Sequence, residues 1–295
     1  MTSPKTVSVA VIVFNHGKYL ARTLEGIEAQ NLERQIEIVI HDDASTDDSE
    51  AVYRRFAETS RHKVKVIRQQ QNIHSRQISL WPYIMAECTG DMIAICEGDD
   101  FWLSPDKLAV QCAGLDQLPH VDIAFHKVAR VHYESEALMG FYSDYGDEPK
   151  LFGPGEVIEG DGGFMPTPSL VIRRSVFDTM PAFFFDKPPV GDYFLQVWGS
   201  IRGGALYMPM AGAAYREGDP TSWSQRVRYD LAAANRFELQ FIEYLFHLRR
   251  SLPLQFSPNV DKIMMNHYMA LCRNSFHFRT MDSLEEVAKL IRKNS

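Results

Sequence analysis

The sequence is poor in cysteine, has no excess of positive charge and lacks a long apolar run. Its four cysteines lie far apart, with no C-x-x-C pair and no histidine at zinc-binding spacing, so we expect buried thiols in a reducing compartment. The formal net charge of −7 argues against a nucleic-acid-binding protein, because such proteins usually carry a basic face. No apolar run approaches the roughly 20 residues that span a bilayer.

Signals for targeting and for several common enzyme classes are also missing. Residues 1–4 lead into a strand-like segment without a signal-peptide pattern, which predicts a soluble cytoplasmic protein, free or peripherally attached to a membrane. The absence of G-x-S-x-G, G-x-x-x-x-G-K-[ST] and an early G-x-G-x-x-G removes most support for serine hydrolases, P-loop enzymes and classical dinucleotide binders. The ten histidines show no H-x-x-H pattern, and each is expected to be a surface or core residue rather than a ligand.

The first hundred residues alternate between apolar strands and amphipathic helices. The expected strands are residues 7–14, 36–40, 64–67 and 92–96, and the expected helices are residues 18–27, a helix opened by a capping box of Ser45 and Asp48, and residues 77–87. This repetition predicts an α/β fold with a mostly parallel sheet flanked by helices. Ligands of such sheets bind at the carboxyl ends of the strands.

The remainder of the chain is less regular until its helical end. We expect a helix with Ser104 as N-cap, a long loop near the site over residues 142–168, and helices from residue 224 to the end. The other expected elements are extended backbone over residues 121–132, strands over 169–173 and 205–210, and a helix over 192–201.

Two acidic clusters follow expected strands. Glu97, Asp99 and Asp100 end the fourth strand; Mg²⁺ or Mn²⁺ shared by these carboxylates would offset their repulsion and bridge a diphosphate, while a solvated turn that caps the next helix explains them equally well. Asp42 and Asp43 end the second strand. A carboxylate there can accept hydrogen bonds from a nucleobase or ribose, although a turn and helix cap is the simpler local interpretation.

Three segments carry a resemblance to a known family. V-S-V-A-V-I-V-F-N (residues 7–15), I-V-I-H-D-D-A-S-T-D (38–47) and E-G-D-D-F-W (97–102) closely resemble the successive motifs of family 2 glycosyltransferases, and the resemblance spans roughly residues 5–220. It implies a GT-A fold and an inverting, metal-dependent transfer of sugar from a nucleotide-sugar donor, with UDP-sugars favoured, to an acceptor hydroxyl. It also implies a catalytic domain over residues 1–223, divided near residue 103 into nucleotide- and acceptor-binding halves.

The resemblance assigns roles around the donor. Asp43, with Asp42 beside it, is similar to the acid that contacts the nucleobase, and Phe14 and Asn15 end the motif on the nucleotide side. Arg76 resembles a basic residue near the nucleotide, although a surface helix residue is an equally good interpretation.

The same resemblance places the metal and the catalytic base. Asp99 resembles the D-x-D acid that holds Mn²⁺ or Mg²⁺, with Glu97 at the position of the first acid and Asp100 near the donor sugar or the metal shell. V-G-D-Y-F-L (residues 190–195) is similar to the motif that provides the general base, which assigns that role to Asp192. Its alternative role, a helix N-cap, is compatible with the first.

A late segment departs from the family pattern. Y-R-E-G (residues 215–218) resembles a segment that often continues with a histidine near the diphosphate and metal, but here Gly218 stands in its place and Glu217 or water would fill the gap. Arg216 and residues 221–224 are expected in a loop that closes on the phosphates. Two other functions stay open: a sugar nucleotidyltransferase, and a nucleotide-sugar-binding protein that has lost turnover.

The acceptor is not identified by these motifs. A glycan, a lipid-linked molecule and a protein all fit. The helical region over residues 224–295 is expected to dock on its own core or to form a dimer contact, and its apolar surface also allows contact with a membrane.

Overall fold

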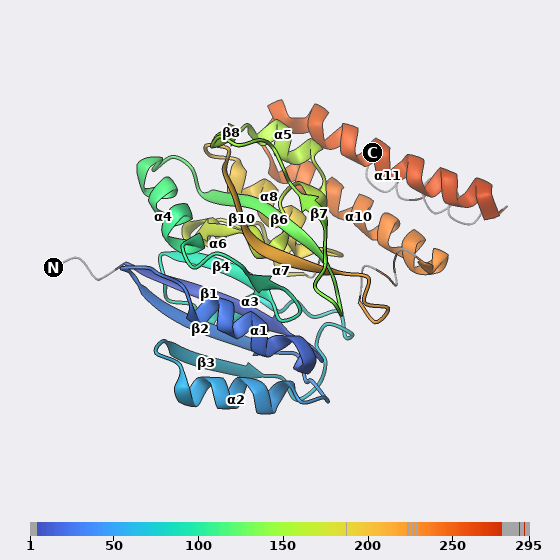
Figure 1. The fold of residues 1–295 in the computed structure, drawn as a ribbon. Coiled ribbons are helices and arrows are strands. Elements are labelled where there is room, and N and C mark those ends of the chain that lie inside the picture. Colours follow the sequence, from blue (N-terminus) through green and yellow to red (C-terminus); the bar gives the residue numbers. More distant parts are fainter. Residues whose placement is uncertain are drawn as a thin grey trace.

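The computed structural model describes residues 5–186, 188–222, 225, 227, 229–278, 289 and 292, which form one ten-stranded mixed sheet flanked by helices (Figure 1). The strand order is β3-β2-β1-β4-β9-β6-β10-β5, with β7 paired to β6 and β8 paired to β10. The strands are β1 (Thr6–Val13), β2 (Gln35–Asp42), β3 (Lys63–Arg68), β4 (Met92–Glu97), β5 (Phe101–Trp102), β6 (Ile123–His132), β7 (Leu138–Tyr142), β8 (Lys150–Phe152), β9 (Val171–Arg173) and β10 (Ala205–Glu217).

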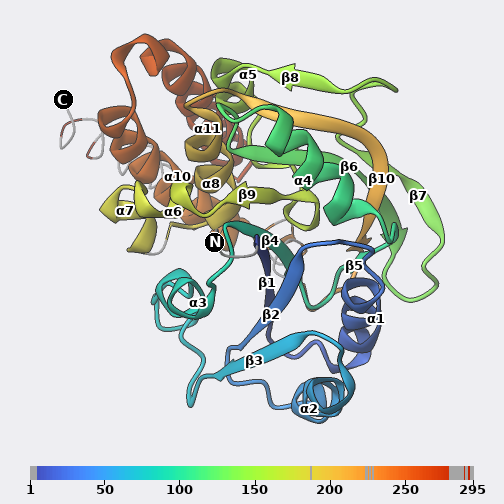
Figure 2. The same ribbon diagram turned by 90° about the vertical axis from the view of Figure 1, so that its left-hand side faces the viewer.

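The first half confirms the predicted parallel sheet. Strands β1, β2, β3 and β4 pair in parallel, and the crossovers are α1 (Gly17–Glu28), α2 (Ser49–Thr59) and α3 (Trp81–Glu87). Valines at alternate positions of β1 pack under α1, α2 and α4 (Lys107–Gln117), while Ala10 faces the opposite core with α3 (Figure 2). Burial on both faces explains why β1 is an almost unbroken apolar run.

The second half reverses direction. Strand β9 lies antiparallel between β4 and β6, and β10 runs parallel to β6 with bulges between Met208 and Ala213. Strand β10 continues to Glu217, seven residues beyond the predicted end at residue 210, because β6 and β5 provide partners along its whole length. The sheet therefore changes direction next to β4, where the acidic turn lies.

Three local predictions are wrong. The capping box at Ser45 does not form: α2 begins after Asp48, and the Ser45 hydroxyl accepts a hydrogen bond from the Asn15 N–H. The helix expected over residues 77–87 begins at Trp81, since Gln77 has a left-handed backbone (φ 62°). Helix α4 has Asp106, not Ser104, at its N-cap position.

The segment predicted as a loop over residues 142–168 contains short elements. These are β8, α5 (Pro154–Glu159) and two 3₁₀ turns, Gly162–Phe164 and Thr167–Ser169. Three further helices follow: α6 (Ser175–Asp178), α7 (Ala182–Phe185) and α8 (Gly191–Ser200).

Two long helices end the described chain. Helix α10 (Leu231–Ser251) and α11 (Ser257–Phe278), joined through a 3₁₀ turn (Leu254–Phe256), pack with α5 and α8 (Figure 1). Phe241, Ile242 and Leu245 of α10 are buried in the same core as α8, so this helix docks on its own core. None of the described helices is long and apolar enough to cross a membrane. The start predicted at residue 224 lies outside the described residues, as does the predicted helical end after residue 280 except for residues 289 and 292.

Candidate active site

The loops after β1 and β2 are braced against each other at the carboxyl edge of the sheet. The Thr46 N–H donates to Asn15 Oδ1 at 2.8 Å, and the Asn15 N–H donates to Ser45 Oγ at 2.9 Å. Asn15 and Ala44 both have left-handed backbones (φ 55° and 62°). Phe14, directly after β1, is 42% exposed. The Asn15 side chain is committed to the loop, and nucleotide contact by either residue stays a prediction.

Asp42 and Asp43 are adjacent but have different environments. Asp42 is fully buried and accepts hydrogen bonds from the Tyr53 hydroxyl (3.0 Å) and the Ser45 N–H (2.8 Å). Asp43 accepts the backbone N–H groups of Ile73 (2.6 Å) and His74 (3.0 Å). Asp42 therefore supports the loop, whereas Asp43 joins β2 to the segment after β3.

Arg76 lies on that segment and is exposed. Its guanidinium donates to Gln71 Oε1 at 2.7 Å, within the same turn. It is not in a helix, contrary to the surface-helix interpretation, because the chain turns before α3. A contact between Arg76 and a nucleotide stays a prediction.

The acidic turn after β4 is fixed by contacts from α1 and β1. The Gly98 N–H donates to a backbone oxygen of β1 at 2.8 Å, and the Thr23 hydroxyl lies 2.6 Å from the Asp100 carbonyl oxygen. The Asp99 side chain is 34% exposed, whereas Asp100 is buried. Asp99 is thus the acid that an ion or diphosphate can approach.

Crowding raises the pKa of two carboxyl groups in this turn. Burial, followed by the charges of Asp99 and Asp192, raises the pKa of Glu97 to about 8. Burial, followed by the charges of Asp99 and Glu97, raises the pKa of Asp100 well above its ordinary range. Asp100 Oδ2 is buried and has no hydrogen-bond partner among the described residues. A nearby cation would favour the ionised forms of all three acids.

These observations fit a divalent cation that takes few ligands from the protein. Among the described residues, no group of three or more His, Cys, Asp or Glu side chains forms a complete metal centre. Mg²⁺ is commonly held by one or two carboxylates plus substrate phosphates and water. The exposed Asp99 carboxylate and the unpartnered oxygen of Asp100 suit such an ion.

Arg216 holds the acidic turn from the opposite side. Its backbone N–H donates to Asp100 Oδ1 (3.0 Å), and its guanidinium donates to the Asp99 carbonyl (2.6 Å) and to Glu136 Oε1 (2.5 Å). The guanidinium carbon lies 4.8 Å from the centre of the Tyr19 ring and 4.4 Å from that of Phe101. Arg216 therefore positions the turn, and its contact with phosphates stays a prediction.

Asp192 comes from the second half of the chain and lies near the acidic turn. It lies in the first turn of α8, whose N-cap position is Val190, so the interpretation of Asp192 as the N-cap is wrong. Its oxygens accept the Tyr193 N–H (2.8 Å) and the Thr167 hydroxyl (3.4 Å). Burial raises the pKa of Asp192, and its charge contributes to the raised pKa of Glu97. The two acids therefore lie close enough to interact.

Three residues near these acids received no individual role from the sequence, although His16 is among the polar residues that follow the predicted strands. His16 Nε2 lies 3.8 Å from Asp99 Oδ2, Glu136 binds Arg216, and Thr167 binds Asp192. Glu136 and Thr167 lie in stretches without a motif. His16 directly follows Asn15 in a loop at a strand end, and this place was the available signal.

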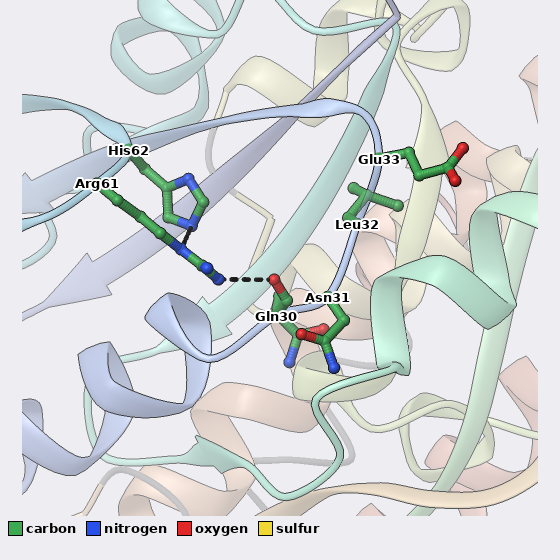
Figure 3. Close-up of a pocket in the computed structure, with 6 residues that line it drawn as sticks. All are labelled: Gln30, Asn31, Leu32, Glu33, Arg61 and His62. Atoms are coloured by element: carbon green, nitrogen blue, oxygen red, sulfur yellow. Dashed lines mark hydrogen bonds between the residues drawn. The ribbon is translucent and has the colours of Figure 1, made fainter.

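Two pockets differ in their relation to the site. One, with a volume of about 510 Å³, is lined by Gln30, Asn31, Leu32, Glu33, Arg61 and His62 (Figure 3). These residues precede β2 and β3, so this pocket lies at the amino ends of the strands, away from the acids. A second pocket begins at Gly218 and Pro220, directly after β10, and also includes Tyr229 and Arg236.

The family follows from comparison of the sequence. Residues 8–179 match the model of the family described as glycosyl transferase family 2. The chain belongs to this family. A protein of Mycobacterium tuberculosis that has no described function is 30% identical over 213 residues, which cover 71% of this chain and 58% of the relative. A glycosyltransferase of Nostoc, itself uncharacterised, is 35% identical over 102 residues, covering 35% of this chain and 30% of the relative. The chain thus spans little more than half the length of its mycobacterial relative.

Solved structures confirm the GT-A fold. Staphylococcus aureus TarS (residues 1–349), in complex with UDP-GlcNAc, superposes with a TM-score of 0.59 over 93% of this chain and 92% of that chain, at 14% identity. The mannosyltransferase PcManGT from Pyrobaculum calidifontis, in complex with GDP-Man and Mn²⁺, gives a TM-score of 0.59 over 98% of this chain and 80% of that chain, at 17% identity. At these identities the likeness concerns the fold alone.

Proposed function

We propose that this family 2 member transfers a sugar from a nucleotide-sugar donor to an acceptor hydroxyl, with inversion and with Mn²⁺ or Mg²⁺. The observation that carries this proposal is the position of Asp192, which lies close enough to the acidic turn for its charge to act on Glu97. It joins a base from the second half of the chain to the acidic turn of the first half. UDP-sugars are the donors that we favour, and the complexes of similarly folded proteins with UDP-GlcNAc and GDP-Man support a nucleotide sugar.

The nucleotide would lie over the loops after β1 and β2, in the half of the chain that ends near residue 103. Asp43 uses one lone pair of each oxygen for the Ile73 and His74 N–H groups. A carboxylate has about four such sites, so Asp43 keeps acceptor capacity for a nucleobase N–H. The Asp43 N–H donates to the Val13 carbonyl oxygen, and the next residue, Phe14, offers an exposed ring.

Asp99 would hold the cation together with the donor diphosphate, and Asp100 would support it from the buried side. The bound ion supplies Lewis-acid stabilisation of the departing diphosphate. Arg216 and Thr23 keep the acidic turn in place, so that the charge of Asp99 is positioned before the donor binds.

Asp192 would remove the proton from the acceptor hydroxyl as that oxygen attacks the anomeric carbon. Its raised pKa makes it a stronger base than an exposed aspartate, and the Thr167 hydroxyl orients one of its oxygens. General base catalysis by a positioned carboxylate contributes about 10²- to 10⁴-fold in rate. Inversion follows because base and leaving diphosphate act on opposite sides of the sugar.

A thermal-shift screen of UDP, GDP, dTDP and CDP and their sugars, each with Mn²⁺ and with chelator, tests the donor assignment. A ligand that binds the native state raises the melting temperature. We expect a metal-dependent shift for one nucleotide, lost in Asp99→Ala. If no nucleotide shifts the folded protein, the donor assignment is wrong. The alternative function, a sugar nucleotidyltransferase, differs from a glycosyltransferase in that it uses a nucleoside triphosphate as substrate. The other alternative, a nucleotide-sugar-binding protein without turnover, is favoured by Gly218 at the position of the family's histidine.

A further inference from the structure

The backbone of His16 is fixed at the start of α1. Its carbonyl oxygen accepts the N–H groups of Tyr19 (2.8 Å) and Leu20 (2.9 Å) in the first turn of α1, and its N–H donates to Ser49 Oγ (3.0 Å). These bonds fix the backbone from which the imidazole extends. Its side chain is 20% exposed, so a ligand can reach it.

The ring is also oriented. A Cβ atom at Gly98 would lie 2.8 Å from His16 Nδ1, so only glycine leaves room for the imidazole at this place in the acidic turn. Nδ1 is buried and has no hydrogen-bond partner among the described residues. Nε2 points the other way and lies 3.8 Å from Asp99 Oδ2.

The spacing of 3.8 Å lies within about 1 Å of the spacing between two ligands of one ion. A direct charge-assisted hydrogen bond would bring the two atoms to about 2.8 Å. Two ligands at about 2.1 Å from a shared cation lie about 3.0 Å apart when adjacent and about 4.2 Å apart when opposite. The observed spacing falls between these values.

We propose that His16, through Nε2, binds the same divalent cation as Asp99. This inference rests on the proposed function and adds a nitrogen ligand, from the loop after β1, to the oxygen ligands of the acidic turn and the diphosphate. Imidazole nitrogen suits transition-metal ions, whereas Mg²⁺ takes oxygen ligands. The site therefore prefers Mn²⁺ over Mg²⁺ because of His16.

Pulsed electron paramagnetic resonance of the full chain with Mn²⁺ and UDP tests this directly. Electron spin-echo modulation detects nitrogen bound to Mn²⁺, and histidine labelled with the heavier nitrogen isotope shifts the modulation if the nitrogen belongs to histidine. We expect this signal in the wild type and its loss in His16→Gln. Mn²⁺ affinity should fall by about tenfold or more, since even residues around the ligands commonly cost that much.

His62→Gln is the matched control. His62 lies in the pocket at the other end of the sheet (Figure 3) and should keep the full signal. His16→Asn provides a second substitution if His16→Gln does not fold. The isotope shift is measured in the wild type, so the test of histidine binding to Mn²⁺ remains possible even if a variant does not fold.

The outcomes separate this inference from the proposed function. Mn²⁺ that binds with UDP, depends on Asp99 and shows no histidine nitrogen overturns the role of His16 and leaves the proposed function standing. A nitrogen signal that persists in both His16 variants has the same consequence. If Mn²⁺ does not bind at all with any nucleotide, both proposals fail.

Discussion

The backbone N–H of Arg216 donates to the Asp100 carboxylate at 3.0 Å, although 116 residues separate the two. This bond joins the end of β10 to the acidic turn after β4, and the Arg216 guanidinium binds the Asp99 carbonyl in the same turn. The last strand of the sheet thus fixes the acids that the first half provides.

Replacing Arg216 should loosen this turn. Arg216→Lys cannot contact the Asp99 carbonyl and Glu136 together, so we expect a loss of about 1–3 kcal/mol in the free energy of unfolding. Urea denaturation measures it. Arg130→Lys, which weakens a pair with Glu217 made by a more exposed arginine (30% against 4% for Arg216), is the matched control and should cost less. Equal losses in the two variants would contradict the role of Arg216.

Substitutions of the two neighbouring aspartates should have different effects, one on stability and the other on nucleotide binding. Asp42→Asn disturbs a fully buried acceptor of the Tyr53 hydroxyl and should cost about 1–3 kcal/mol of stability with little change in nucleotide affinity. Asp43→Asn should weaken nucleotide binding by about tenfold, equivalent to about 1.4 kcal/mol. Calorimetric titration with the nucleotide found in the screen measures affinity. Unchanged affinity in Asp43→Asn would remove this residue from the donor site.

Stability without metal should depend on pH through Glu97. Its pKa rises on folding from 4.5 to about 8, so the folded state binds more protons in this range and loses stability as pH rises through it. Burial lowers the pKa of Lys107 to about 7 and that of His126 to about 3, so both also add to the pH dependence of stability. The difference between wild type and Glu97→Gln is therefore the informative quantity. In chelator, the wild type should lose stability relative to Glu97→Gln between about pH 4.5 and 8, by on the order of 1 kcal/mol or more. If the difference in stability between the two proteins stayed constant between about pH 4.5 and 8, it would contradict the raised pKa of Glu97.

Thr167 should tune the base. Its hydroxyl favours the charged form of Asp192 and so opposes the effect of burial on the pKa of that residue. Thr167→Val should raise the pKa of Asp192 further and move the acid limb of the kcat/KM profile to higher pH, while Thr167→Ser keeps the hydroxyl and the profile. Identical profiles for the Val and Ser variants would show that Thr167 does not act on the base.

The sequence predicted the first half of the fold well because its signals are local. The apolar runs that became β1, β2 and β4 are buried on both faces, and parallel pairing brings Asp42 and Glu97 to one edge. The position of the acid clusters at this edge of the sheet could therefore be predicted from the sequence.

The rest depends on contacts between distant residues. Strand β10 extends to Glu217 because β6 and β5 pair with it. Ser45 does not cap a helix as predicted, because its hydroxyl accepts a hydrogen bond from the Asn15 N–H. The place of His16 beside Asp99 needs the absence of a side chain at Gly98, which no pattern in the loop after β1 indicates. Contacts between distant residues leave no periodic pattern in the sequence, so they could not be predicted from it.

The central claim is that Asp192 acts as the base in sugar transfer at the Asp99 site. The test is the rate at which nucleotide is released from the sugar donor in the presence of Mn²⁺, with either an acceptor or water as the attacking molecule. This rate is compared between wild type and Asp192→Asn. We expect nucleotide affinity to stay within about twofold, because Asp192 lies on the acceptor side, while turnover falls by about 10²- to 10⁴-fold. Equal turnover in the two proteins would contradict the account.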